Sequence, residues 1–173
     1  MNEGGLTQEE KQILLKLARE AIEDAVCQRY MPPLDLSGLP PRLREKGAAF
    51  VTLSESGELR GCIGALEATQ PLAEDVRDHA AAAAVEDFRF PPVRPDELDR
   101  LEIEISRLTR PQPLEYDGPL DLVNKLRPGI DGVVLKDGIR RATFLPQVWE
   151  KLPNPVEFLD QLCLKLGVPR STW

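Results

Sequence analysis

The stretch AAFVTLSESGELRGCI, residues 48–63, contains two strand-forming runs on either side of a polar tetrapeptide. Residues 48–53 and 58–63 combine β-branched and other apolar side chains, which favour extended structure in a half-buried sheet. The intervening Ser54-Glu55-Ser56-Gly57 segment has the composition of a tight turn. Two short strands joined this closely pair antiparallel, so the sequence predicts a β-hairpin.

An amphipathic helix is predicted before this hairpin. Thr7 and Glu10 have the spacing of a capping box, in which side-chain oxygens accept hydrogen bonds from free backbone N–H groups. The proline-rich residues 31–41 that come after the helix are predicted to form a surface loop. The helix is expected to end near Gln28, because apolar residues recur until then at intervals that place them on one face. These residues are Ile13, Leu14, Leu17, Ala18, Ala21, Ile22 and Ala25.

A second helix and a third strand follow the hairpin. Pro71 is predicted as the first residue of this helix, where its missing N–H would have no partner, and an alanine-rich run extends the helix to Val85. Pro91-Pro92 then prevents any further helix. In LEIEIS, residues 101–106, apolar and polar residues alternate, which predicts a strand with one buried face.

A short helix and a second hairpin are predicted in the C-terminal third. The helix lies around residues 121–126 and is broken by Arg127-Pro128-Gly129. Residues 132–136 and 139–144 flank Asp137-Gly138, a pair that predicts a hairpin with a type I′ turn because both residues tolerate positive φ.

The last predicted element is a helix over residues 155–166, which Gly167 ends in the left-handed conformation. Helices in this order, with strands joined by tight turns, indicate an α+β (α/β) fold. We expect a mostly antiparallel or mixed sheet flanked by helices, in a single domain over residues 1–173.

The composition argues against several classes of protein. The 173 residues include 22 basic and 29 acidic side chains, and the resulting net charge of −7 opposes binding to nucleic-acid phosphates. The three cysteines are isolated, so no disulfide framework or metal site is predicted, and a reducing compartment fits best. No cofactor is predicted. Charged residues interrupt the first long apolar segment, residues 13–26, which excludes a signal sequence and a membrane span there. The protein is predicted to be cytoplasmic.

The segment Leu59-Arg60-Gly61-Cys62-Ile63-Gly64 is the main candidate for a functional site. Regular strand alternation places Arg60 and Cys62 on one face, with the leucine and the isoleucine on the other. A cation beside a thiol favours the thiolate, which makes Cys62 a candidate catalytic nucleophile. Gly61 and Gly64 leave room for a ligand or another backbone, so they and Arg60 are candidate binding residues. The alternative is a small, buried, unreactive Cys62.

Three further residues are candidate binding groups. His79, the one histidine of the chain, falls on the apolar face of the second predicted helix, where it is either a hydrogen-bonded core residue or a catalytic group. Asp87 and Arg89 follow that helix, and Arg89 either binds an anion or pairs with Asp87 or Glu86 to fix the loop. A thiol nucleophile also needs a general base, and no Cys-His-Asp arrangement follows from the sequence.

These segments resemble a known family, the AMMECR-type domain, also called protein A of the AmmeMemoRadiSam system. The resemblance covers almost the whole chain. The family usually has Asp-Pro-Arg-Phe where this chain has Asp87-Phe88-Arg89-Phe90. Besides residues 59–64, the matching segments are Pro71-Leu72-Ala73-Glu74, residues 87–92, residues 101–106, Leu145-Pro146-Gln147-Val148 and residues 158–165.

The resemblance implies an intracellular α/β domain with a larger and a smaller subdomain, and it adds Gln147 to the candidate binding residues. It also implies partners, namely a Memo-type, dioxygenase-like protein and a radical SAM protein that act in one modification system. The first hypothesis is therefore an accessory or recognition protein of such a system. The alternatives are an enzyme that uses Cys62 as a thiolate nucleophile or redox thiol, and a nucleic-acid-binding module, which the net charge disfavours.

Overall fold

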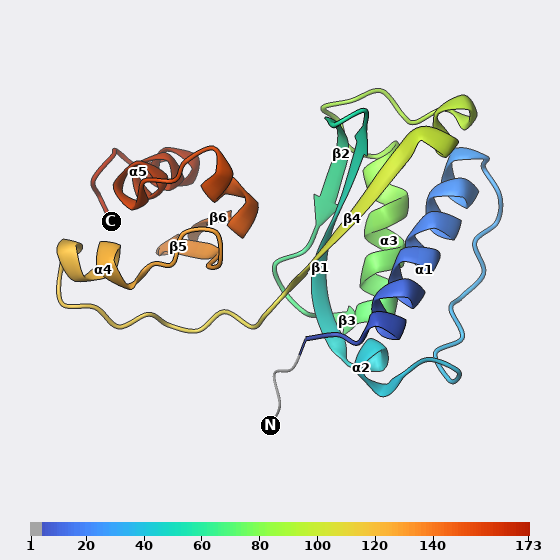
Figure 1. The fold of residues 1–173 in the computed structure, drawn as a ribbon, viewed down its shortest axis with the longest axis horizontal. Helices are drawn as coiled ribbons and strands as arrows, with labels where there is room; N and C mark the ends of the chain where they lie inside the picture. Colours follow the sequence, from blue (N-terminus) through green and yellow to red (C-terminus); the bar gives the residue numbers. More distant parts are fainter. Residues whose placement is uncertain (1–4) are drawn as a thin grey trace. The chain divides into compact units, whose positions relative to one another are not determined.

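The structure is a computed structural model that describes residues 5–173. The chain forms two compact units, a first that ends at Thr109 and a second from Arg110 to Trp173 (Figure 1). Each unit combines helices with antiparallel strands, which confirms the predicted α+β class. No helix of the described residues has both the length and the apolar composition needed to cross a membrane.

The first unit is built on a four-stranded antiparallel sheet. Its central strand is β1 (Lys46–Glu55), which pairs with β2 (Glu58–Gly64) and β4 (Leu101–Leu108), and at its start with the short β3 (Gln70–Pro71). β1 and β2 form the predicted hairpin. Both residues of its loop have positive φ, 53° and 81°, as in a type I′ turn.

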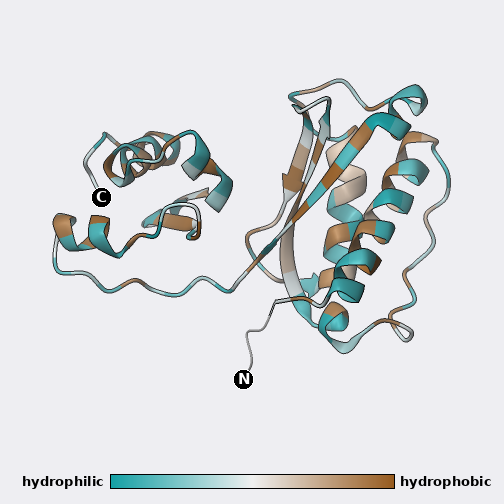
Figure 2. Cartoon of the chain, viewed as in Figure 1, coloured by the Kyte–Doolittle hydropathy of each residue, from teal (hydrophilic) through white to brown (hydrophobic). Residues whose placement is uncertain are grey.

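Two long helices, α1 (Gln8–Val26) and α3 (Leu72–Val85), cover one face of this sheet (Figure 1). The predicted capping box is present at the start of α1, and hydrophilic and hydrophobic residues alternate along that helix, as expected for its amphipathic pattern (Figure 2). Apolar side chains from the helices and from every second residue of the strands form the core, which includes Leu14, Ile22, Val51, Leu53, Val76 and Ala80. The opposite face, away from α1 and α3, is called the outer face below.

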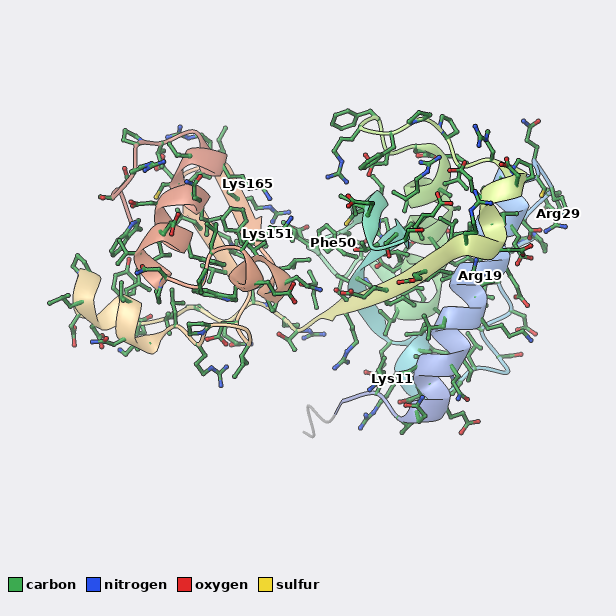
Figure 3. All side chains as sticks on the ribbon, turned by 45° about the horizontal axis from the view of Figure 1, so that its top comes forward. Lys11, Arg19, Arg29, Phe50, Lys151 and Lys165 are labelled. Atoms are coloured by element: carbon green, nitrogen blue, oxygen red, sulfur yellow. The ribbon has the colours of Figure 1, made fainter. Side chains whose placement is uncertain are left out.

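Polar contacts connect these layers. Arg19 of α1 donates hydrogen bonds to the carbonyl oxygens of Leu98 and Leu101 at 2.8 and 2.7 Å, where β4 begins (Figure 3). These bonds fix α1 against the residues that enter β4. Short helical segments, α2 (Pro41–Arg44) and the 3-10 helix η1 (Pro95–Arg100), complete the first unit.

The second unit contains α4 (Pro119–Lys125), the strand pair β5 (Val133–Asp137) and β6 (Arg140–Phe144), the 3-10 helix η2 (Pro146–Glu150) and α5 (Pro155–Leu166). Its core is aromatic, because the Trp149 ring stacks on Phe158 at 3.7 Å and Phe144 meets Phe158 edge-on. As predicted, Gly167 ends α5 in the left-handed conformation with φ of 83°.

Two local predictions are wrong. Pro71 is not the first helical residue but belongs to β3 and forms the N-cap of α3, because it pairs with Lys46 of β1. In the second hairpin, Asp137 still pairs with Arg140, so the loop is Gly138-Ile139 rather than Asp137-Gly138. Positive φ at Gly138, the first of the two loop residues, is typical of a type II′ turn.

Candidate functional site

A β-bulge at Arg60 changes which residues of the LRGCIG motif share a face. Gly61 lies opposite Leu53 of β1, and the next residue of β1 lies opposite Leu59. Arg60 is therefore an extra residue in the ladder, and the regular alternation is interrupted there. The predicted regular alternation is wrong here, because Leu59 lies opposite Ser54 and Ile63 opposite Val51, so the leucine and the isoleucine no longer share a face.

The two glycines of the motif lie where a side chain would meet backbone atoms. A Cβ atom on Gly61 would lie 2.1 Å from the carbonyl oxygen of Ala83 in α3, and one on Gly64 would lie 2.5 Å from the carbonyl oxygen of Ala49. Backbone oxygens cannot turn aside as a flexible side chain can. The clearance at these glycines is thus occupied by the protein's own chain, and a ligand contact at either of them stays a prediction.

Asp87 and Arg89 bind the backbone of β2 at Cys62. The Cys62 N–H donates to Asp87 Oδ2 at 2.8 Å, and Arg89 Nη2 donates to the Cys62 carbonyl oxygen at 3.1 Å. Arg89 also grips both carboxylate oxygens, with Nε 2.9 Å from Oδ1 and Nη2 2.6 Å from Oδ2. Of the two roles predicted for Arg89, pairing with Asp87 is the one observed. We call this arrangement the first clamp.

The first clamp is ionic at every physiological pH. Asp87 is only 5% exposed, yet the guanidinium of Arg89 holds the pKa of its carboxyl far below the usual 3.8. Burial acts in the opposite direction, and the hydrogen bond from the Cys62 N–H adds to the lowering. The same pairing raises the pKa of Arg89. A buried carboxylate that stays charged in this way fixes the loop after α3 to the edge of β2.

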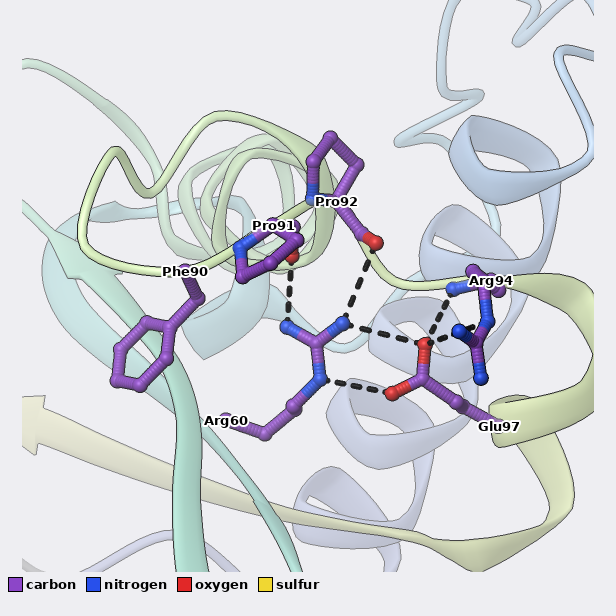
Figure 4. Close-up of a pocket in the computed structure, with 6 residues that line it drawn as sticks. All are labelled: Arg60, Phe90, Pro91, Pro92, Arg94 and Glu97. Atoms are coloured by element: carbon purple, nitrogen blue, oxygen red, sulfur yellow. Dashed lines mark hydrogen bonds and ion pairs between the residues drawn. The ribbon is translucent and has the colours of Figure 1, made fainter.

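Arg60 forms a second clamp on the far end of the same loop (Figure 4). Its Nε and Nη2 atoms donate to the two carboxylate oxygens of Glu97 at 2.9 and 3.1 Å, and its Nη1 atom donates to the carbonyl oxygen of Pro91 at 2.8 Å. A further bond from Nη2 reaches the carbonyl of Pro92. Arg60 lowers the pKa of the buried Glu97 to about 2. Arg60 therefore binds this loop, and no hydrogen bond in residues 5–173 joins it to the Cys62 thiol.

The Cys62 thiol lies on the outer face, next to Thr52 of β1. Thr52 Oγ1 donates to Cys62 Sγ at 3.4 Å. Within residues 5–173, no hydrogen bond joins the thiol to a histidine or a carboxylate. A nucleophilic thiol is normally activated by an adjacent base, and this arrangement supplies a hydroxyl group instead.

His79 belongs to a separate arrangement inside α3. Its Nδ1 atom lies 3.2 Å from Asp75 Oδ2, although the ring is turned too far for a straight hydrogen bond. Asp75 is almost fully buried and accepts a hydrogen bond from the N–H of Ala49 at 2.8 Å. Of the two roles predicted for His79, the position is closer to that of a core residue, here beside the carboxyl group that holds β1, although Nδ1 has no hydrogen-bond partner among the described residues.

We expect the imidazole of His79 to titrate above its ordinary pKa of 6.5, because the Asp75 carboxylate raises that pKa more than partial burial lowers it. A raised pKa means that His79 stabilises the fold fully below the unfolded-state value and less as pH rises through the folded-state value. NMR titration of this one histidine measures its pKa, and Asp75→Asn should lower it. A value at or below 6.5 in the unaltered protein would contradict the pairing.

Sequence reasoning missed Glu97 and Thr52. Glu97 had a signal, since Pro95-Asp96-Glu97 places proline first and an acid third in a helical turn, and Glu97 does accept from the Arg94 N–H at 2.7 Å. Thr52 had none. Gln147 lies in η2 of the second unit, and its part in binding stays a prediction. Within residues 5–173, no group of three or more His, Cys, Asp or Glu side chains is arranged to hold a metal ion.

Comparison with known proteins identifies this architecture. The family model AMMECR1 matches residues 15–173, which include both clamps and the whole LRGCIG motif. The chain belongs to the AMMECR1 family. This confirms the resemblance inferred from the sequence, and the family assignment covers both units of the chain.

Two similar proteins match this chain over more than four fifths of their own length. A protein of Thermofilum pendens is 41% identical over 98% of this chain and 84% of its own, and protein MK0488 of Methanopyrus kandleri is 42% identical over 97% and 82%. The crystal structure of the uncharacterized protein PH0010 from Pyrococcus horikoshii superposes with a TM-score of 0.84 at 37% identity. That match covers 95% of this chain and 83% of PH0010.

Proposed function

We propose that this AMMECR1 domain is a recognition protein, and that the loop of residues 87–92 binds a partner protein. The observation that carries the proposal is Phe88, whose side chain is 95% exposed in a loop held by both clamps. A large apolar side chain gains about 2 to 3 kcal/mol when it is buried. A fixed loop loses little conformational entropy on binding, so that gain is available for affinity.

The partners that fit the proposal are the Memo-type and radical SAM proteins expected for this family. In such a modification system, the AMMECR1 domain would hold a partner in place while another component performs the chemistry. Arg60, Asp87, Arg89 and Glu97 support a binding role over a catalytic one, because each is used to fix the protein's own loop.

Replacing Phe88 by serine is expected to weaken partner binding at least tenfold, because an exposed aromatic at the centre of an interface is a typical hot spot. The measurement is the affinity of the purified chain for the Memo-type and radical SAM proteins encoded by the same genome. Tyr30→Ser is the matched control, since Tyr30 is an aromatic residue of the first unit that is 82% exposed. The proposal fails if neither protein binds, or if Phe88→Ser binds as well as the unaltered chain.

The second candidate function is a reactive thiol at Cys62. One observation favours it: the guanidinium of Arg89 donates to the Cys62 carbonyl oxygen at 3.1 Å, so a cation lies beside this cysteine. The charge of Arg89 is however already balanced by Asp87, which grips it with both oxygens. We therefore rank a thiol enzyme below a recognition protein.

Alkylation rates separate the two functions. We expect iodoacetamide at neutral pH to modify Cys62 more slowly than the exposed Cys27, because Cys62 is half-buried and its sulfur accepts from Thr52. Peptide mass spectrometry measures each rate, with the buried Cys163 as the slow reference. If Cys62 reacted faster than Cys27, the thiol would be activated and the enzymatic alternative would be favoured.

A further inference from the structure

A small hollow adjoins the second clamp and the loop of residues 87–92, which is called the docking loop below. Its volume is about 250 Å³, and it lies between Phe90 at one end and Arg94 at the other (Figure 4). The rings of Pro91 and Pro92 and the Arg60–Glu97 ion pair complete the lining. This volume is below the range of pockets that hold drug-sized ligands, and it suits one side chain of a partner.

The charged side chains that line the hollow differ in how freely they can pair with a bound group. Both carboxylate oxygens of Glu97 are occupied, one by Arg60 Nε and the other by Arg60 Nη2 and the N–H of Arg94. Arg60 is bound in turn by Glu97 and by two proline carbonyls. Neither member of this buried pair therefore presents net charge to an incoming group.

Arg94 is the charged group that remains open to solvent. Its side chain is 69% exposed, and its guanidinium pairs with Asp96, which is exposed to a similar degree, while Nε also lies 3.8 Å from Oε2 of the buried Glu97. An ion pair between two exposed side chains is weak, so a carboxylate brought in by a partner can replace Asp96 at little cost. The hollow thus combines apolar rings with one exchangeable positive charge at its rim.

From this combination we infer that the hollow binds an apolar side chain next to a carboxylate, within one segment of the partner protein. The inference rests on the proposed function, because the hollow shares Phe90, Pro91 and Pro92 with the docking loop. The apolar side chain lies against the rings of these three residues. The carboxylate pairs with Arg94, and this sets the direction of the segment.

Two blocked dipeptides test the inference on the full chain. We expect acetyl-Leu-Asp-amide to cause saturable NMR shifts of the Phe90 and Arg94 amides, with a dissociation constant on the order of millimolar for so small a ligand. Acetyl-Leu-Asn-amide, which lacks the charge, should bind about two to five times more weakly, since one exposed ion pair contributes up to about 1 kcal/mol. Equal binding of the two dipeptides, or no saturable shift at these amides, would overturn the inference.

Variants assign the effect to the hollow. Arg94→Gln should remove the preference for the aspartate dipeptide and leave the apolar contribution, whereas Phe90→Ala should weaken both dipeptides. Arg100→Gln is the matched control, because Arg100 is a half-exposed arginine at the other end of η1 that also pairs with a carboxylate but lies outside the hollow. Loss of the preference in Arg100→Gln as well would count against a local site.

The outcomes distinguish this inference from the proposed function. If Phe88→Ser abolishes capture of the partner while neither dipeptide binds, the docking loop stands and the hollow is not its specificity site. If the aspartate dipeptide binds at Phe90 and Arg94 while Phe88→Ser captures the partner normally, the hollow is a binding site and Phe88 is not needed for recognition.

Discussion

Replacing Gly61 by alanine is expected to lower the stability of the first unit by about 3 kcal/mol, at the upper end of the usual cost of overpacking. The new Cβ atom would lie 2.1 Å from the carbonyl oxygen of Ala83, well inside the 3.0 Å that Cβ atoms essentially never go below. The obstacle is helix backbone, so either α3 or β2 has to move. Because Gly61 precedes Cys62, such a movement would also disturb the first clamp.

Hydrogen exchange of the amides in β2 and α3 measures this loss directly. Tryptophan fluorescence would not, because both tryptophans, Trp149 and Trp173, belong to the second unit. Gly38→Ala is the matched control, since no atom lies within 4 Å of the position of its Cβ, and we expect a change of less than about 0.5 kcal/mol. Unchanged exchange in Gly61→Ala would mean that α3 and β2 pack less closely than described.

Elements that depend on local sequence pattern could be predicted. The capping box of α1, the hairpin of β1 and β2, and β4 each follow from periodicity within a window of about ten residues. The glycine that ends α5 is equally local. A local pattern does not fix the boundary where two elements compete for one residue, as at Pro71, which pairs with β1 immediately before α3 starts.

The candidate site could be predicted only where its partners are close in sequence. Asp87 and Arg89 are two residues apart, and a pairing over so short a distance in sequence can be predicted. The bulge at Arg60 does not follow from the pattern of the strand, and Arg60 pairs with Glu97, 37 residues further along the chain. Alternation predicts the faces of a regular strand, but it does not predict where a bulge interrupts that strand.

This difference changes the interpretation of the LRGCIG motif. As a regular strand, it would present a cation and a thiol side by side, which favours chemistry. In the structure, Arg60 binds the loop of residues 87–92, and Gly61 lets the backbone of α3 approach closely. The backbone N–H of Cys62 donates to Asp87 in the first clamp. The motif therefore fixes the loop that carries Phe88 and Phe90, and this arrangement is the physical basis of the proposed recognition function.

Replacing Asp87 by alanine is the second change with a large expected effect, a loss of about 3 kcal/mol in the stability of the first unit. The substitution leaves the Cys62 N–H without its acceptor and removes the partner of Arg89. An unsatisfied buried donor costs about 1 to 3 kcal/mol, and the unpaired arginine adds to this, although water reaches its half-exposed guanidinium and recovers part of the loss. Asp87→Asn keeps one acceptor oxygen and should lie between alanine and the unaltered chain.

The pH dependence identifies the charge of Asp87 as the cause. Its folded-state pKa is depressed, so its contribution is fully present above the unfolded-state value near 3.8 and is lost as pH falls further toward the folded-state pKa. Hydrogen exchange followed downward from pH 5 should show this loss in the unaltered chain and a smaller one in Asp87→Asn. Asp96→Asn is the control, because Asp96 also pairs with an arginine but is exposed, and its removal should not change stability measurably. The clamp would be refuted if Asp87→Asn lost as much stability in acid as the unaltered chain.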